Sequence, residues 1–264
     1  MWDPHQYLRH AGHRLRPLLD LLAHVPEELP GPPGRPRVAD LGCGPGGPST
    51  ALVARWPEAH VTGYDNSAEM LEEAGAQARE GLDFAHADLA TWRPDPGERF
   101  GLLFSNAALH WVPDHPDAFP AWIEALPPGG VLAFQVPGNF AAPSHTLLAE
   151  LRDSPRWRSR LGAPTRTRPV LDPAGYADRL ARLGCDVDAW ETTYLHLLTG
   201  PDPVLDWTRG TTLRPVLARL DDEPAARDDF LAEYAAALRA AYTRREDGVT
   251  PFPFRRVFVV AVKR

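Results

Sequence analysis

Apolar runs alternate with amphipathic stretches over the first 137 residues of the chain. The apolar runs have the length and composition of buried strands and lie at 37–41, 61–64, near Phe84, at 100–104 and at 131–136. The intervening stretches carry apolar residues at helical spacing, at 49–55, 68–79 and 116–125. Strands that alternate with helices in this way predict a parallel sheet of the α/β class.

The pattern changes after Pro137. Two helical stretches come first, at 144–152 and 173–183. A strand is expected near 187–195, then a helical region of mixed polarity at 202–245, and a final strand of β-branched and aromatic residues at 256–262. We therefore expect a seven-stranded, mostly parallel sheet flanked by helices, with a helical lid inserted between the last two strands.

The chain is expected to form a single domain, 1–264. Leucines near helical spacing predict a helix over 4–25, and the proline-rich segment after it cannot continue that helix. We expect residues 1–30 to cover a site with their helix and residues 37–137 to form the ligand-binding core.

Composition narrows the class of partner. The 264 residues carry 28 basic and 35 acidic side chains, a net charge of −7, which disfavours nucleic acid or an anionic membrane as partner and favours a small molecule. Cys43 and Cys185 have neither metal-site nor disulfide-framework spacing, so we expect no metal and a reducing, cytoplasmic location. No stretch of about 18 apolar residues or signal-peptide pattern occurs, so no membrane span is expected.

The strongest motif is the glycine loop VADLGCGPGG at 38–47, between a strand and a helix. Gly42, Gly44 and Gly47 fit the spacing G-x-G-x-x-G, which a nicotinamide dinucleotide or another nucleoside would satisfy equally. Asp40 separates these alternatives, because a carboxylate before the turn would repel a pyrophosphate. It suits a cofactor with an ammonium, a sulfonium and no phosphate, and S-adenosylmethionine is such a cofactor.

Two further carboxylates end successive strands. Asp65 lies 21 residues after Gly44 and can accept from both ribose hydroxyls, and Asp88 is placed to accept from an adenine amino group with Leu89 beside the ring. The alternative for these residues is helix capping or simple surface exposure. Cys43 fits a tight turn better than a nucleophile.

At this point the motifs carry a family resemblance. DLGCGPGG, GYDNSAEML, HADL and LLFSNAALHWVPD resemble the successive motifs of class I S-adenosylmethionine-dependent methyltransferases. AWETTYLHLL, DWTRGTTLRP and FPFRRVFVVA extend the resemblance over nearly the whole chain, to the trans-aconitate methyltransferase family. The resemblance implies a Rossmann-like fold, S-adenosylmethionine as cofactor and a tricarboxylate substrate.

The resemblance also implies roles for individual residues. The cofactor-binding set is Gly42, Gly44 and Gly46 around the methionine part, Asp65 on the ribose, Asn66, Met70, Asp88 and Leu89 around the adenine, and Asn106 at the start of the loop facing the methyl group. The loop departs from the family pattern at Gly47 and Pro48, where GPGNST is expected. Proline is tolerated at a first helical position, so the cofactor site is expected to survive.

If the methyl acceptor is a carboxylate, its chemistry determines which protein groups the substrate site must contain. Its pKa of about 4 leaves the acceptor oxygen ionised at neutral pH, so no general base is required. Cationic groups must then match the charges, and Arg214, Arg255 and Arg256 are the candidates because guanidinium groups pair with carboxylates bidentately. The alternative for each arginine is a surface salt bridge.

Aromatic and histidine side chains complete the candidate substrate site. The candidates are His110 as a possible catalytic hydrogen-bond donor, Trp111 as a cavity wall, Tyr194 and His196 on one face of a strand, and Tyr7 and Trp207 as residues that close the site. Packing in the core is the alternative for each of them.

Three other functions remain open at this stage. The cofactor-binding motifs in residues 37–137 would also be present in a natural-product methyltransferase that acts on oxygen or nitrogen. They would equally be present in a non-catalytic module that only binds S-adenosylmethionine. A nicotinamide-dependent reductase is disfavoured by Asp40. We expect a monomer or weak homo-oligomer, and the sequence leaves open which carboxylate is methylated and which related acids are accepted.

Overall fold

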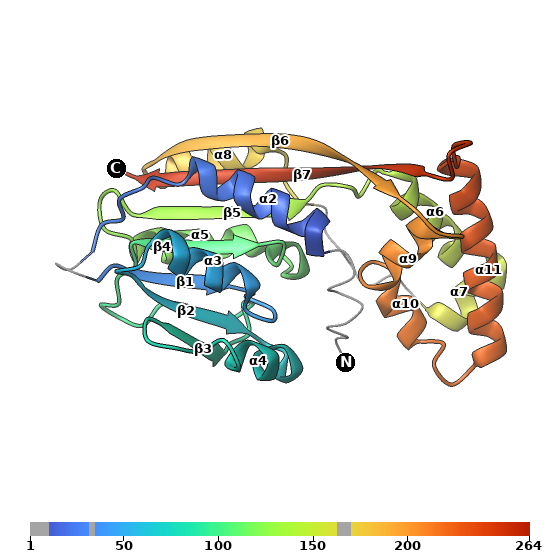
Figure 1. Cartoon of the computed structure of the whole chain (residues 1–264), viewed down its shortest axis with the longest axis horizontal. Coiled ribbons are helices and arrows are strands. Elements are labelled where there is room, and N and C mark those ends of the chain that lie inside the picture. Colours follow the sequence, from blue (N-terminus) through green and yellow to red (C-terminus); the bar gives the residue numbers. More distant parts are fainter. Residues whose placement is uncertain (1–10, 32–34, 163–169) are drawn as a thin grey trace.

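The computed structural model describes residues 11–31, 35–162 and 170–264. Within them, seven strands form one sheet in the order β3-β2-β1-β4-β5-β7-β6 (Figure 1). The strands are β1 (Arg37–Leu41), β2 (His60–Asp65), β3 (Leu82–His86), β4 (Leu102–Asn106), β5 (Val131–Pro137), β6 (Cys185–Leu198) and β7 (Thr250–Lys263). The first five pair in parallel, whereas β7 is antiparallel to both β5 and β6. The prediction of a mostly parallel seven-stranded sheet is confirmed.

Helices cover both faces of this sheet. They are α2 (Ala11–His24) and α3 (Gly47–Arg55) on one face, α5 (Phe119–Glu124) and α8 (Pro173–Arg182) on the other, and α4 (Ala68–Gly75) beside β3. Successive strand residues serve opposite faces, so Leu103 packs with Trp122 of α5 while Phe104 packs with Leu52 of α3. Two short 3₁₀ helices, η1 (Leu109–Trp111) and η2 (His115–Ala118), follow β4.

A second group of helices, here called the helical lobe, stands beyond the sheet. It contains α6 (Pro143–Asp153), α7 (Pro155–Leu161), α9 (Pro203–Arg209), α10 (Arg214–Ala218) and α11 (Pro224–Ala241). Strands β6 and β7 pair over fourteen residues and extend from the sheet into the lobe (Figure 1). Leu198 and Phe252 at their far ends belong to the apolar core of the lobe, together with Trp157 and Phe230.

The lobe differs from the expected lid in its membership. Helices α9 to α11 do lie between the last two strands, but α6 and α7, which precede β6, pack into the same core. Helix α7 was not expected at all, because its sequence PRWRSRL offers only Trp157 and Leu161 for burial. The last strand begins at Thr250, earlier than residue 256, because it continues to pair with β6 as both enter the lobe.

Proline marks the start of many helices in the described chain. Helices α6, α7, α8, α9 and α11 each begin at a proline. The first helical position has no intrahelical acceptor for its N–H and favours the fixed φ of proline. These five prolines therefore mark helix starts.

The N-terminal helix lies against the sheet and not over a cavity. Leu18 and Leu21 of α2 share an apolar core with Phe104 and Phe258, and Asp20 accepts a hydrogen bond from the Tyr194 hydroxyl at 2.6 Å. No described residue of α2 is among those that line the cavities reported below, and the expectation that residues 1–30 cover the site stays a prediction. Residues 1–10, with Tyr7, lie outside the described residues.

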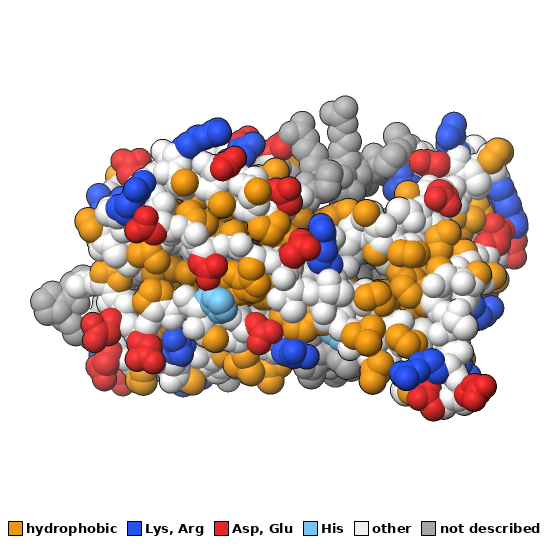
Figure 2. All heavy atoms as spheres, turned by 90° about the horizontal axis from the view of Figure 1, so that it is seen from above, with side chains coloured by type: hydrophobic (Ala, Val, Ile, Leu, Met, Phe, Trp, Pro, Cys, Tyr) orange, Lys and Arg blue, Asp and Glu red, His pale blue; other side chains and the backbone are white. Residues whose placement is uncertain are grey.

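The surface seen in Figure 2 mixes acidic, basic and hydrophobic side chains along its length. On that face the basic side chains do not gather into one field of the kind that binds a nucleic-acid backbone. Among the described residues, no helix has the length and apolar content needed to cross a bilayer.

Candidate active site

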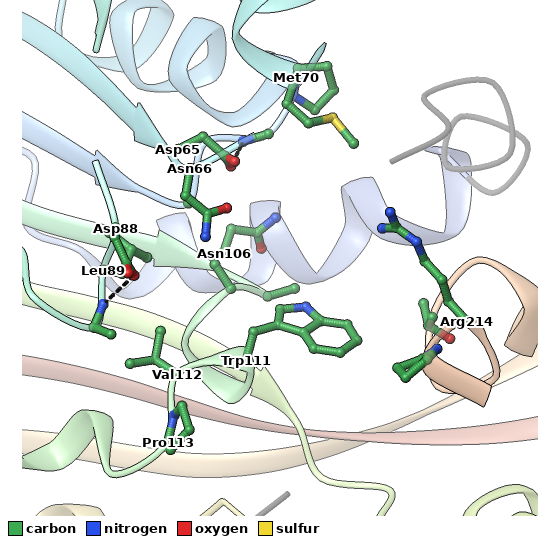
Figure 3. A pocket seen from close by; sticks show the side chains of 18 of the residues that line it. Asp65, Asn66, Met70, Asp88, Leu89, Asn106, Trp111, Val112, Pro113 and Arg214 are labelled. Atoms are coloured by element: carbon green, nitrogen blue, oxygen red, sulfur yellow. Dashed lines mark hydrogen bonds between the residues drawn. The ribbon is translucent and has the colours of Figure 1, made fainter. Parts of the chain in front are cut away.

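The main cavity lies at the carboxyl ends of β1, β2 and β4 and has a volume of about 430 Å³. The strand order reverses between β1 and β4, which is where open α/β sheets bind ligands. Its wall includes ten residues from the sheet side, Gly42, Gly44, Pro45, Asp65, Asn66, Met70, Asp88, Leu89, Asn106 and Trp111. Helix α10 of the helical lobe supplies the opposite wall with Arg214 (Figure 3).

The glycine loop brings backbone to the edge of this cavity. Gly42 has φ of 80° and donates its N–H to the Tyr64 carbonyl at 2.8 Å. A Cβ on Gly42 would lie 2.1 Å from the Cβ of Ala108, so only glycine fits. Gly44 has φ of 54° and donates its N–H to Asp65 Oδ2 at 2.9 Å. The loop is therefore fixed against the end of β2.

Asp65 is held at both carboxylate oxygens. Oδ2 accepts from Gly44, and Oδ1 accepts from the N–H of Ser67 at 2.9 Å. Ser67 caps α4 by accepting from the N–H of Met70. Met70 consequently enters the cavity wall from the first turn of α4, and Asn66 enters it from the residue just before the cap (Figure 3).

Asp88 lies at the opposite end of the cavity from Arg214 (Figure 3). Its Oδ1 accepts from the N–H of Ala90 at 2.9 Å, and the adjacent Leu89 is buried beneath the cavity. The structure thus brings Asp65, Asp88 and Leu89 to one cavity, as their positions after successive strands predict.

Asp40 and Gly46 lie behind the loop and are not among the lining residues. Asp40 is fully buried, and its Oδ2 accepts from the Ser49 hydroxyl at 2.6 Å. Burial raises the pKa of Asp40 to about 7, against the lowering effect of Ser49. A Cβ on Gly46 would meet the Phe84 ring at 3.0 Å. The structure therefore does not bring these two residues into the cavity wall with the other candidates, and their contact with a ligand stays a prediction.

A small inner chamber of about 60 Å³ adjoins the main cavity and shares Asn106, Trp111 and Thr211 with it. The inner chamber also includes His110, Gln135, Trp207 and Arg256. Arg256 is 4% exposed, and its guanidinium lies 4.8 Å from the centre of the Phe254 ring. A buried cation at this end suits an anionic ligand.

His110 has the properties of a neutral hydrogen-bonding group. Desolvation, and then the nearby positive charge of Arg256, lower the pKa of His110 to about 3. The imidazole is therefore uncharged at neutral pH. Among the described residues its Nδ1 has no hydrogen-bond partner.

An outer cavity of about 340 Å³ continues from the inner chamber into the helical lobe. It shares His110, Trp111, Trp207 and Phe254 with the inner chamber. Most of its remaining wall is apolar, with Phe140, Leu148 and Val216, while His145 and Arg152 add polar groups. Trp207, which the sequence analysis expects to close the site, thus lines both the inner chamber and the outer cavity.

Arg214 is the first residue of α10 and belongs to the main cavity. Partial burial lowers the pKa of its guanidinium, and the charge of Glu69 opposes this shift. A guanidinium still remains protonated at neutral pH. The structure places Arg214 on the lobe side of the main cavity, whereas Arg256 lines the inner chamber.

Three sequence-predicted substrate residues lie outside these cavities. Arg255 is exposed, donates to the Gly138 carbonyl and pairs with Glu191 at 3.3 Å, because successive strand residues point to opposite faces and Arg256 takes the inner one. Tyr194 and His196 do share a face, with rings 7° from parallel. Tyr194 packs under α2, however, and His196 stacks on Trp207 behind the chamber wall.

Gln135 is the residue that the sequence reasoning missed. It is 1% exposed in the middle of β5, where its neighbours Phe134 and Val136 are apolar and fully buried. A single amide within the run VLAFQVP was the available signal, since a buried polar group needs partners. Among the described residues no group of three or more His, Cys, Asp or Glu side chains is placed to hold a metal.

Comparison with known proteins agrees with the geometry. A family model described as a methyltransferase domain matches residues 38–130. The chain is 60% identical to a trans-aconitate 2-methyltransferase of Streptomyces coelicolor, over 99% of this chain and 86% of that protein. It is 56% identical to a protein of the same name from Streptomyces avermitilis, over 99% of this chain and 97% of that one.

Solved structures of lower identity share the fold. The YcgJ protein of Bacillus subtilis has a TM-score of 0.57 at 17% identity, covering 88% of this chain and 93% of that one. A Haemonchus contortus phosphoethanolamine N-methyltransferase 2, solved with S-adenosylhomocysteine, has a TM-score of 0.55 at 17% identity, covering 94% of this chain and 52% of that one.

Proposed function

The chain belongs to the trans-aconitate 2-methyltransferase family, and on that premise we propose that it transfers a methyl group from S-adenosylmethionine to a carboxylate of trans-aconitate. The products are a monomethyl ester and S-adenosylhomocysteine. The observation that carries the substrate assignment is Arg256, a buried guanidinium at the inner chamber next to the main cavity.

The main cavity fits the cofactor in its chemistry. Asp65 and Asp88 offer carboxylate acceptors for ribose and adenine groups, and Gly42 and Gly44 of the glycine loop line the same cavity. An acidic residue at the position of Asp65 also binds the ribose of dinucleotides, so the assignment of S-adenosylmethionine rests on the methyltransferase family model and the named relatives. When bound, S-adenosylmethionine supplies a sulfonium methyl group that is open to attack by an oxygen anion.

The chain's own residues bind and orient the acid. Arg256 neutralises one carboxylate, and Asn106 stands where the main cavity meets the inner chamber. His110 offers hydrogen bonding without a charge, because its pKa of about 3 keeps it neutral. An ionised carboxylate needs no base, so positioning and exclusion of water are the protein's share of the catalysis.

Aromatic side chains limit the access of water to the transfer site. Trp111 belongs to both the main cavity and the inner chamber, and Trp207 and Phe254 complete the chamber wall. Trp207 comes from α9, so the helical lobe forms part of the enclosure and we propose that it acts as the lid. Arg214 is proposed as a second carboxylate clamp, from α10.

The outer cavity favours a second candidate function. Its volume of about 340 Å³ and mostly apolar wall would suit an acceptor larger than a tricarboxylate, methylated on oxygen or nitrogen. In that case the cofactor site would be unchanged, and the acid in the inner chamber would carry an apolar extension into the lobe.

Incubation of the purified protein with S-adenosylmethionine and one acid at a time separates these candidates. Trans-aconitate, cis-aconitate, isocitrate and citrate would each be analysed for a monomethyl ester by mass spectrometry. We expect an ester from trans-aconitate. Cofactor binding with no ester from any of the four acids would reject the substrate assignment and leave the larger acceptor, or a module that only binds the cofactor.

We further propose that the chain works as a monomer or weak homo-oligomer on a small molecule in the cytoplasm, and not on nucleic acid. The net charge of −7 supports the small-molecule partner. Cys43 and Cys185 are both buried and free of disulfides, as suits a reducing compartment.

A further inference from the structure

We propose that Gln135 is a positioning residue that fixes which end of the Asn106 amide faces the acid, in a hydrogen-bond chain that starts at Arg256. The inference rests on the proposed function and adds to it a residue that neither the motifs nor the comparisons assign. It follows from three side chains on neighbouring strands.

The three side chains are joined by two hydrogen bonds. Arg256 Nη1 donates to Gln135 Oε1 at 3.0 Å, and Gln135 Nε2 donates to Asn106 Oδ1 at 2.7 Å. The strands impose this neighbourhood, because Gln135 of β5 pairs in register with Asn106 of β4 and Arg256 pairs with Pro137. Gln135 is 1% exposed, so each of its polar atoms must find a partner within the protein.

Arg256 fixes which atoms donate and which accept in these two hydrogen bonds. A guanidinium can only donate hydrogen bonds, so the Gln135 atom that faces it has to be the carbonyl oxygen. The amide nitrogen of Gln135 then faces Asn106, which has to accept through its own carbonyl oxygen. The Nδ2 group of Asn106 is thereby the end left for the cavities.

The orientation of the Asn106 amide matters where the main cavity meets the inner chamber. Asn106 borders both the main cavity and the inner chamber. With its orientation fixed, it presents two N–H donors to an anionic acceptor, beside the positive charge of Arg256. If the amide turned over, its carbonyl oxygen would face the carboxylate of the acid and repel it. Gln135 therefore acts on acid binding through Asn106 and does not need to touch the acid.

Two variants test this role. Gln135→Met keeps the size of the side chain and removes both hydrogen bonds. Gln135→Glu keeps the acceptor for Arg256 but cannot donate to Asn106. We expect each to raise the KM for trans-aconitate at least about tenfold, while the Kd for S-adenosylmethionine stays within about twofold of wild type. Because Gln135→Glu also places a carboxylate beside Arg256, the role through Asn106 is decided by the double-mutant cycle described below.

Ser105 supplies the matched control. It is also fully buried in β4 and donates to the Leu41 carbonyl at 2.7 Å. Ser105→Ala removes a buried hydrogen bond from the same sheet, so it should lower the melting temperature without changing the KM for the acid. An equal rise in KM from Ser105→Ala and from the Gln135 variants would overturn the proposal.

A double-mutant cycle shows whether Gln135 acts through Asn106. In the Asn106→Ala background, adding Gln135→Met should change the KM for the acid by less than about twofold, because the group to be oriented is gone. A further tenfold loss in that background would show that Gln135 acts on its own and would contradict the inference.

A substrate-free readout separates this proposal from the identity of the acid. In wild-type protein, one side-chain amide proton of Gln135 should exchange slowly with solvent by NMR, since it is donated to Asn106. If wild type makes no ester from any acid but this protection is present, the proposed function fails and the hydrogen-bond chain stands. Rapid exchange of both Gln135 amide protons would show that the hydrogen bond from Gln135 to Asn106 is not formed and would overturn the proposal.

Discussion

Ala108 occupies the space that a side chain on Gly42 would need. The Cβ of Ala108 lies 2.1 Å from the position that a Cβ on Gly42 would take, and Gly42 itself has φ of 80°. The loop after β1 and the loop after β4 therefore approach one another closely at the main cavity. Asn106 and Ala107, with φ of 57°, belong to the same second loop.

Replacement of Gly42 should disturb both loops at once. In Gly42→Ala, an alanine at positive φ costs about 1–2 kcal/mol, and the added methyl must also displace Ala108. We expect the affinity for S-adenosylmethionine, measured by calorimetry, to fall at least about tenfold. Gly47→Ala is the matched control, because nothing lies within 4 Å of its Cβ position. Equal affinities of the two variants would contradict the close packing of the loops.

Arg255 and Arg256 form a natural test of strand alternation. Removal of Arg256 leaves the acid without a buried counter-charge, so Arg256→Ala should raise the KM for trans-aconitate at least about thirtyfold. Arg255→Ala breaks an exposed pair with Glu191 and should change this KM by less than about twofold. Steady-state kinetics at fixed S-adenosylmethionine compares them, and a larger effect from Arg255→Ala would reverse the assignment of the two faces.

The comparison of these neighbours shows where the sequence was informative. Asp65, Asp88 and Asn106 could be placed together because the carboxyl ends of parallel strands share one edge of the sheet. Arg255 and Arg256 could not be separated, since the register of β7 against β5 decides which one faces inward. The sequence of a strand predicts that successive side chains point to opposite faces of the sheet, but it does not predict which of the two sets points toward the cavity.

The contacts among distant segments were the other part that the sequence left open. Tyr194 and His196 were correctly expected on one face, but α2 and the helical lobe cover that face. The joining of α6 and α7 with α9 to α11 depends on how β6 and β7 extend beyond the sheet. Gln135 was missed because its importance comes from partners on two other strands.

Arg214 should affect the acid more than the cofactor if it is a carboxylate clamp. In Arg214→Ala we expect the KM for trans-aconitate to rise about tenfold and that for S-adenosylmethionine to change much less. Arg209→Ala, at an exposed position on α9, serves as the control. Equal increases in both KM values would show that Arg214 belongs to the cofactor side of the cavity.

Asp40 predicts a pH dependence of stability in the cofactor-free protein. Burial raises its pKa from 3.8 to about 7, so its protonated form is favoured in the folded state. Its contribution to stability is present in full below pH 3.8 and is lost as the pH rises through about 7. Asp40→Asn cannot ionise and keeps an acceptor for Ser49, so it should raise the melting temperature much more at pH 8 than at pH 5, where only part of the stability has been lost. The same difference at both pH values would contradict the raised pKa.

The central claim is methyl transfer to a tricarboxylate bound between Asn106 and Arg256. The most direct measurement supplies S-adenosylmethionine with a deuterated methyl group, together with trans-aconitate, and follows both products by mass spectrometry. The account predicts one labelled methyl ester for each S-adenosylhomocysteine formed, and a loss of that product in Arg256→Ala. A wild-type protein that binds S-adenosylmethionine but leaves trans-aconitate unlabelled would contradict it.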